Sequence, residues 1–206
     1  MIKFEELEVW GLVHAVRGMR NPMNSWDKSD SEYDEETCEF EIGENDYNLM
    51  QRLIKAGQSH RKFLRQIFIS VDITAPLYWW KEFDTYKVGI TSNSTSTMHK
   101  VHAKEFELDD FSCEHLDKVS KEVLTKIIDE LNCNRTLFNK TKDKQNWWNI
   151  IQLLPSSYNQ KRTITMSYEN IINILENRRY HKLDEWRDFC EWSLTLPCSK
   201  ILEIKG

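Results

Sequence analysis

The sequence contains few of the residues that mark specialised protein classes. Only six of its 206 residues are Gly and four are Pro, which excludes collagen-like chains and chains dominated by flexible linkers. No apolar run approaches the ~18–20 residues that a membrane-spanning helix needs. The start of the chain, Met1–Glu6, has acidic residues where a signal peptide has basic ones, so we expect a cytoplasmic protein without membrane contact.

Cysteine is scarce and shows no pattern. The five cysteines are odd in number and contain no C-x-x-C pair, so neither a disulfide framework nor a closed zinc site is expected. Cys190 stands near Phe189 and Trp192 and is predicted to be a small core residue. His99 and His102 are three residues apart, but no third ligand stands nearby, and we predict no metal site.

The composition is otherwise that of a folded globular protein, with an uneven distribution of charge. Apolar residues make up 40% of the chain and aromatic residues 12%, and the net charge is −5. Residues 27–46 hold ten acidic residues against one basic residue, Lys28. This acidic segment is predicted to be a solvated loop or hairpin, or alternatively a cover over a basic pocket or a partner site. The rest of the chain is mildly basic, which suits an anionic small ligand but not duplex nucleic acid.

Hydrophobic periodicity predicts an α/β protein in which a central sheet is flanked by helices. Residues 67–74 are predicted to form a strand that ends at Ala75-Pro76. Residues 3–16 fit a strand or hairpin, although helix is also compatible with them. Helical spacing of apolar residues predicts helices over 45–57, 77–86, 114–131, 147–154, 166–178 and 182–194, a polar connection over 132–146 and a loop over 90–99.

Polar side chains near the middle of the chain are the candidates for a binding site. Residues 91–97 are rich in Ser and Thr, whose hydroxyls, together with backbone N–H groups, can donate to a phosphate; the alternative is a polar surface loop. Lys81, Glu82 and Lys87 flank this run. Arg178 ends a predicted helix, where it suits the negative helix terminus or forks to a phosphate or a pyrimidine carbonyl. The sequence has no G-x-G-x-x-G and no Walker loop.

Several segments in order resemble the flavin-dependent thymidylate synthases. That family has E-H-x-x-F-T-F-x-V-x-A-P, then R-Q-W, then R-H-R-x-x-S-x-N-x-x-S-x-R, and later a helix that closes on N-x-x-L-x-x-R. The present chain has RQIFISVDITAP at 65–76, KEF at 81–83, TYK at 85–87 and TSNSTSTM at 91–98, and it keeps Asn173 and Arg178. The resemblance implies a single domain over residues 1–206, a homotetramer with flavin and nucleotide sites between subunits, and reductive methylation of dUMP by way of reduced flavin.

The departures from the family pattern concern mainly cationic residues. Thr85-Tyr86-Lys87 stands for R-H-R, Met98 for the final Arg, Gln66 for the His of E-H, and Ile151 for an Arg before the L-P pair. Each lost Arg removes about 1.5–3 kcal/mol per charged hydrogen bond, so neither FAD nor dUMP is expected to bind tightly in the family's manner. By the resemblance, the remaining site comprises nucleotide-binding Lys81, Glu82, Lys87, Thr91, Asn93, Ser94, Ser96 and Arg178, and cofactor-binding Asn173 and Tyr86. The aromatic residues at 78–83 are expected to stack on a base.

Three functions compete on these grounds. The first is a divergent relative, of the kind a phage carries, that binds or sequesters a nucleotide with its flavin chemistry altered or lost. The second is an active flavin-dependent methyltransferase acting on dUMP or a related pyrimidine nucleotide. The third is a protein–protein interaction module that uses the acidic segment.

Overall fold

The structure of the protein is a computed structural model that describes residues 2–37 and 39–203. Cys38 therefore lies outside the described residues. Contacts divide the chain into two compact units. The first unit comprises Met1–Phe4, Asp72–Thr85 and Ser92–Thr163, and the second comprises Glu5–Val71, Tyr86–Thr91 and Ile164–Gly206. The single domain expected over 1–206 stays a prediction.

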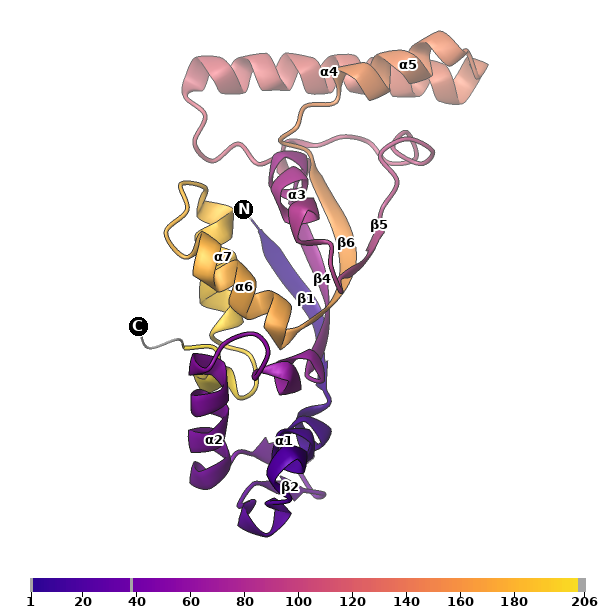
Figure 1. Ribbon diagram of the computed structural model, residues 1–206. Helices are drawn as coiled ribbons and strands as arrows, with labels where there is room; N and C mark the ends of the chain where they lie inside the picture. The colour runs from indigo at the N-terminus through magenta and orange to yellow at the C-terminus, as the bar shows by residue number, and fades with distance from the viewer. Residues whose placement is uncertain (1, 38, 204–206) are drawn as a thin grey trace. The chain divides into compact units, whose positions relative to one another are not determined.

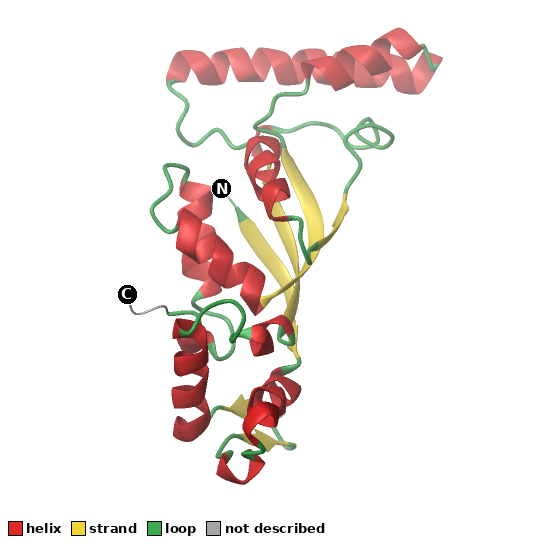
Figure 2. Ribbon diagram, in the orientation of Figure 1, coloured by secondary structure: helices red, strands yellow, loops and turns green. Residues whose placement is uncertain are grey.

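A four-stranded antiparallel sheet runs through the fold (Figure 2). In spatial order its strands are β1 (Lys3–Trp10), β4 (Phe68–Pro76), β6 (Asn159–Ser167) and β5 (Thr91–Ser94). The strand predicted over 67–74 is confirmed as β4, whose alternate residues Ile69, Val71 and Ile73 are buried, as the period of two requires. The mixed α/β class is confirmed as well.

The described residues form seven α-helices, labelled in Figure 1. They are α1 (Leu12–Arg20), α2 (Glu44–Lys55), α3 (Leu77–Phe83), α4 (Lys118–Thr141), α5 (Lys144–Leu153), α6 (Tyr168–Arg178) and α7 (Asp184–Ser193). None of the helices in the described part of the chain is long and apolar enough to cross a membrane.

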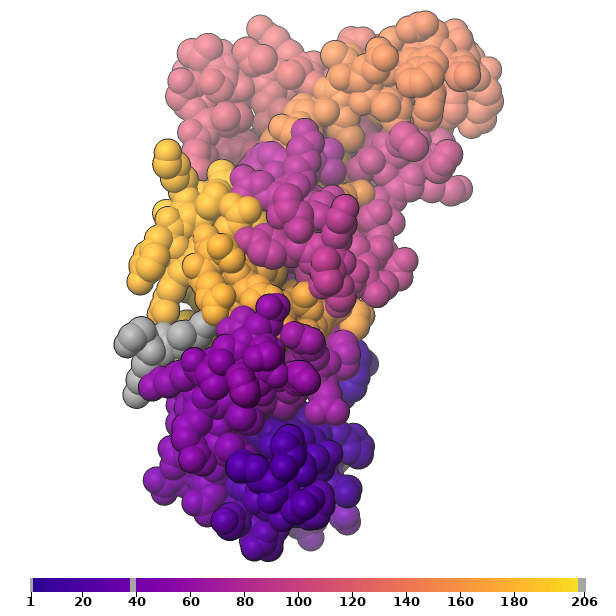
Figure 3. Space-filling model, in the orientation of Figure 1, coloured from indigo at the N-terminus to yellow at the C-terminus, as the bar shows by residue number. Residues whose placement is uncertain are grey.

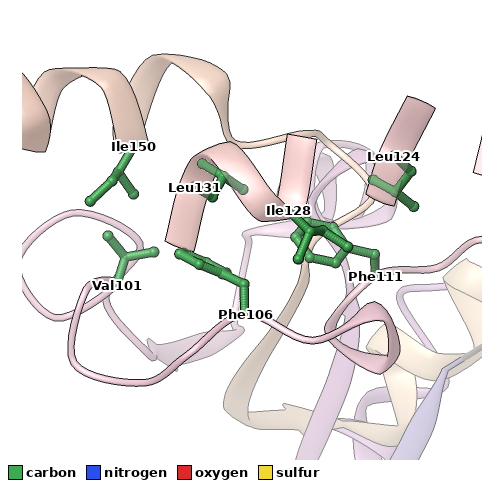
Figure 4. Close-up of a cluster of buried hydrophobic side chains, with 7 residues drawn as sticks. All are labelled: Val101, Phe106, Phe111, Leu124, Ile128, Leu131 and Ile150. Carbon is green, nitrogen blue, oxygen red and sulfur yellow. The ribbon is translucent and has the colours of Figure 1, made fainter. Parts of the chain in front are cut away.

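In the first unit, α4 and α5 pack against each other, and their atoms adjoin in the space-filling view (Figure 3). Their inner faces close over a hydrophobic cluster (Figure 4), whose buried members are Val101, Phe106, Phe111, Leu124, Ile128, Leu131 and Ile150. The polar connection predicted over 132–146 is wrong, because α4 continues to Thr141 and α5 begins at Lys144. The buried Asn134 accepts a hydrogen bond from Asn149 at 2.8 Å, so polar side chains carry this part of the helix contact.

In the second unit, the acidic segment is partly a hairpin and partly a structural support. Strands β2 (Glu32–Asp34) and β3 (Glu39–Glu41) pair antiparallel. Asp30 accepts hydrogen bonds from the backbone N–H groups of Asn45 and Asp46 at 2.9 and 3.1 Å, which caps the N-terminus of α2. Asp46 is fully buried and ion-paired with Arg20 at 2.6 Å. This last acid belongs to the core rather than to a solvated surface.

The junction between β1 and α1 depends on Gly11. Its φ of +92° is a conformation that side chains rarely adopt. A Cβ atom at this position would lie 1.9 Å from the carbonyl oxygen of Gln66. The chain therefore turns from strand to helix where only glycine fits.

Candidate functional site

Arg178 and Tyr86, which the sequence offered as separate candidates, are in direct contact. Arg178 is the last residue of α6, and its Nε donates to the Tyr86 hydroxyl at 2.9 Å. The guanidinium carbon lies 4.9 Å from the ring centroid of Trp186 on α7 and 5.6 Å from that of Tyr86. Trp186 is fully buried, and Arg178 is half-buried. Two aromatic rings and one hydrogen bond thus fix the direction of a partly exposed cation.

A second network in the same unit engages Asn173. Arg61 is buried and donates to Glu169 at 3.2 Å, to Glu176 at 3.0 Å and to the Asn173 side-chain carbonyl at 2.9 Å. The side-chain oxygen of Asn173 therefore already accepts a hydrogen bond from a cationic side chain of the protein. Sequence reasoning missed Arg61, because nothing in its local pattern indicates that it meets α6 more than 100 residues later.

The segment predicted as a loop over 90–99 contains a strand, and that prediction is corrected. Thr91, Asn93 and Ser94 lie on β5 with their side chains exposed. The strand is formed by backbone pairing at a sheet edge, which needs no apolar stripe in the sequence. Beyond it, Ser96 Oγ accepts the backbone N–H groups of Met98 and His99 at 3.2 and 2.8 Å. Ser96 is thereby engaged in a local turn.

Three of the four aromatic residues of α3 are part of the core, which overturns their expected role in base stacking, while Tyr78 is half-buried. Trp79 and Trp80 are fully buried and Phe83 is 2% exposed. Their ring centroids lie 4.8–5.3 Å apart, and Trp80 Nε1 donates to the Gln160 carbonyl at 2.9 Å. No face of these rings is accessible to a base.

The charged neighbours of this aromatic cluster differ in exposure. Lys81 is exposed in the last turn of α3. Glu82 is half-buried, and its backbone carbonyl accepts a hydrogen bond from the Thr85 hydroxyl at 2.7 Å. Lys87 is exposed in the second unit. Of the predicted site residues, the structure brings Arg178 and Tyr86 together, while Lys81, Glu82, Asn93, Ser94 and Ser96 belong to the other unit.

Arg162 is a further cation that the sequence did not single out. It lies on β6 with its guanidinium carbon 4.3 Å from the Trp80 ring centroid. Its Nη1 pairs with Asp84 at 2.7 Å, and its Nε donates to Gln160 at 3.0 Å. Strand β6 was not predicted from the sequence. The alternation of its side chains, which turns Arg162 toward the aromatic cluster, could therefore not be predicted either.

The two histidines considered for a metal site lie in irregular structure. The ring of His102 packs edge-on against Phe138 at 4.7 Å. Burial, with help from Lys142 and Lys100, lowers the pKa of His102. Within residues 2–37 and 39–203, no three His, Cys, Asp or Glu side chains gather as a metal site would require.

Comparison with known proteins assigns the fold. Neither a scan against models of known families nor a search of curated proteins finds a match. Two solved structures of flavin-dependent thymidylate synthase ThyX from Helicobacter pylori, both with FAD and dUMP, share the fold at 17% identity. One has a TM-score of 0.68 and covers 97% of this chain and 98% of its own. The other has a TM-score of 0.71 and covers 100% of both. This chain therefore has the fold of a flavin-dependent thymidylate synthase.

The residues of this chain do not fit FAD in the way that the resemblance implies. A flavin diphosphate needs donors and positive charge, yet Thr85, Tyr86 and Met98 stand where the motif has cations or histidine. The Tyr86 hydroxyl accepts from Arg178, and the Asn173 oxygen accepts from Arg61. The side-chain oxygens of both residues predicted to hold the cofactor thus accept hydrogen bonds within the protein.

Proposed function

We propose that this chain binds a nucleotide on a thymidylate synthase fold, with Arg178 as the principal recognition residue. The observation that carries this proposal is the arrangement of Arg178, whose guanidinium is held over Trp186 and fixed by the Tyr86 hydroxyl. A guanidinium has five donors in a rigid fork, and a partly exposed one suits a phosphate or the carbonyl edge of a pyrimidine. The solved structures with this fold hold dUMP, which supports a pyrimidine nucleotide as the ligand.

Among the other predicted nucleotide-binding residues, Thr91 and Lys87 belong to the same unit as Arg178 and supply weaker contacts. Thr91, Asn93 and Ser94 present exposed hydroxyl and amide groups along β5, and Lys81 and Lys87 are exposed cations. Neutral hydrogen bonds contribute about 0.5–1.5 kcal/mol each, so we expect an affinity that Arg178 dominates. Glu82 and Ser96 are engaged in local structure and belong, with Lys81, Asn93 and Ser94, to the other unit, so their part in binding stays a prediction.

The test is a calorimetric titration of dUMP, dTMP and a cyclic dinucleotide into the full chain. We expect at least one of them to bind, and we expect Arg178→Gln to weaken binding about tenfold or more, since charged hydrogen bonds contribute about 1.5–3 kcal/mol. Arg179→Gln is the matched control, because Arg179 is the next residue and is exposed. If none of the three ligands binds at millimolar concentration, or if both variants behave alike, the proposal fails.

An active flavin-dependent methyltransferase is the second candidate, and the shared fold favours it. It requires the chain to retain FAD and to oxidise NADPH in response to dUMP. The neutral residues Thr85, Tyr86 and Met98, which stand where the motif has cations or histidine, argue against it. Reconstitution with excess FAD, followed by gel filtration, separates the two candidates.

The third candidate is an interaction module built on the acidic segment. It must be tested with a variant that leaves the buried residues of this segment unchanged. Deleting residues 27–46 would remove Asp46, which pairs with the buried Arg20, and would unfold this part of the chain. Replacing the exposed acids Glu32, Glu35 and Glu36 by Gln instead leaves the core intact. Loss of a partner with nucleotide binding unchanged would support this candidate.

A further inference from the structure

A cavity of about 610 Å³ lies in the second unit, where residues 20–28 meet one side of α2. Its volume falls in the range of small-molecule sites, about 300–1,000 Å³. The described residues that line it are Arg20, Met23, Ser25, Lys28, Asn45, Asn48, Leu49 and Arg52. None of the residues proposed for the nucleotide is among them, so a ligand in this cavity is independent of the proposed function.

One face of α2 forms the first wall of the cavity. Its four contributions, Asn45, Asn48, Leu49 and Arg52, stand at positions i, i+3, i+4 and i+7 of the helix. Side chains at this spacing lie on the same helix face. Leu49 is buried and joins this face to the core, while the three polar residues are exposed. The helix therefore presents one guanidinium and two side-chain amides to the same space.

A series of short contacts holds the opposite wall beside this face. Arg20 Nε pairs with Asp46 of α2 at 2.6 Å. The Nη1 of Arg20 donates to the Ser25 carbonyl at 3.1 Å, and its Nη2 donates to the Lys28 carbonyl at 2.9 Å. Arg20 thus fixes the backbone that carries Ser25 and Lys28 next to the first turns of α2. Lys28 and Arg52 lie on the two walls of one cavity.

The cavity has an excess of positive charge although it lies in the most acidic part of the sequence. Asp46 balances Arg20, but within the part of the chain that the structure describes neither the Lys28 nor the Arg52 side chain has an ion pair or a hydrogen bond. None of the described lining residues is Asp or Glu. The neighbouring Asp30 directs its oxygens to backbone N–H groups at the start of α2. A cavity with charge of one sign attracts ligands of the opposite sign.

Ser25 adds a buried polar group to the cavity. The residue is 7% exposed and belongs to the lining. Its Oγ accepts from Arg20 Nη1 at 3.5 Å, and within residues 2–37 and 39–203 no acceptor receives its own proton. A hydroxyl both accepts and donates. The Ser25 hydroxyl therefore retains a donor for an oxygen atom of a bound anion.

We propose that this cavity binds a phosphate group, either as the free ion or as the monoester of a small polar molecule, through Arg52, Lys28 and the Ser25 hydroxyl. A guanidinium engages two phosphate oxygens at once, and an ammonium group supplies a second positive charge. Two cations match the charge of a phosphomonoester, which is about −1.5 to −2 at pH 7. The side-chain amides of Asn45 and Asn48 can donate to and accept from the hydroxyl groups of an ester.

The first test titrates the full chain with ribose 5-phosphate, ribose and inorganic phosphate in a calorimeter at constant ionic strength. Ribose 5-phosphate is expected to bind about tenfold or more tightly than ribose, because only the phosphate pairs with the two cations. Equal affinity for these two, or no binding of either phosphate at tens of millimolar, overturns the proposal. Inorganic phosphate that binds as tightly as the ester supports the site and identifies the free ion as its ligand.

Matched variants assign the binding to this cavity. Lys28→Gln and Arg52→Gln are each expected to weaken ribose 5-phosphate binding severalfold, and both residues are exposed, so the fold should survive, which circular dichroism checks. Lys55→Gln is the control, because it removes one exposed positive charge from the same helix but not from the cavity lining. It should change affinity by less than about twofold, since salt screens exposed charges. If Lys55→Gln weakens binding as much as Arg52→Gln, the effect is general electrostatics and the site is wrong.

The same titration of Arg178→Gln separates this cavity from the proposed nucleotide site. Ribose 5-phosphate binding that persists in Arg178→Gln, and is then weakened by adding Arg52→Gln, belongs to the cavity. If Arg178→Gln alone abolishes all binding, the phosphate binds at Arg178, and the inference fails while the proposed function stands. Failure of dUMP to bind would leave the ribose 5-phosphate result at this cavity unaffected.

Discussion

Asp46 and Arg20 form an ion pair of 2.6 Å in which both side chains are buried. The pair is fully satisfied, because Arg20 also donates to the Ser25 and Lys28 carbonyls at 3.1 and 2.9 Å. Asp46 in turn accepts from the hydroxyls of Ser29 and Ser31, each at 2.7 Å. An acid from the most negative part of the sequence thus holds α1, α2 and the connecting segment together.

Removing the charge of Asp46 should destabilise the protein strongly. Asp46→Asn leaves the buried Arg20 without its counter-ion, and breaking a buried pair in this way costs about 3–5 kcal/mol. We expect a corresponding drop in the free energy of unfolding measured with urea. Asp34→Asn is the control, because Asp34 is exposed at the end of β2 and should cost far less. A drop below about 1 kcal/mol for Asp46→Asn would contradict the structural role.

The same carboxylate predicts how stability depends on pH. Burial alone would raise the pKa of Asp46, but hydrogen bonds from Ser31, Ser29 and Arg20 outweigh it and hold the pKa below its usual value. Its contribution is therefore present above the unfolded pKa of about 3.9 and is lost as the pH falls toward the lower folded pKa. The stability difference between wild type and Asp46→Asn should be constant from pH 5 to 7 and shrink below about pH 4. A difference that persists unchanged into strong acid would show that the pair does not act through ionisation.

Two glycines with similar φ angles should respond differently to substitution. Gly11→Ala places a Cβ 1.9 Å from a backbone oxygen, whereas at Gly57, with φ of +96°, no atom lies within 4 Å. Gly57→Ala carries only the left-handed strain of about 1–2 kcal/mol. We expect Gly11→Ala to lose clearly more stability, or to be insoluble. Thermal denaturation of the two variants measures this difference, and equal losses would mean that the strand-to-helix junction relaxes easily.

Arg61 should be essential for stability because it is the counter-ion of a buried acid. Arg61→Met leaves Glu169, which is 5% exposed, without a partner, at a cost of about 3–5 kcal/mol. Adding Glu169→Leu should recover part of that loss, since an apolar pair replaces a broken ionic one. Chemical denaturation of the single and double variants gives the coupling energy. Strict additivity would contradict the contact, and Lys62→Ala, at an exposed neighbouring position, serves as the control.

Helices and strands that are held by packing of apolar side chains could be predicted from the sequence. Those that are held mainly by backbone pairing or polar contacts could not. Strand β4 and helix α6 were predictable, because Ile69, Val71, Ile171 and Ile172 point into the core at the expected periods. Strand β5 was not, since its four residues are all exposed and only the sheet edge holds them. The second half of α4 was also not predicted. At the contact between α4 and α5 it places Asn134 at a position where helical periodicity requires an apolar residue.

Individual residues of the candidate site could be predicted from the sequence, but the contacts between them could not. Arg178 was recognisable as a cation at a helix end, and Tyr86 by its place in the motif. Their contact, and the role of Trp186 beneath the guanidinium, depend on how α7 packs against α6. Local pattern carries no information on that packing. For the same reason the aromatic residues of α3 looked like a stacking surface until their burial was known.

On the proposed function, Arg178 binds a nucleotide while the chain does not retain FAD, because neutral residues stand where the motif has cations. The most direct measurement is the visible absorbance of the purified chain after incubation with excess FAD and gel filtration, read beside a dUMP titration of the same sample. We predict a colourless protein that still releases heat with the nucleotide, through Arg178. A yellow protein that retains one flavin per chain would contradict the claim.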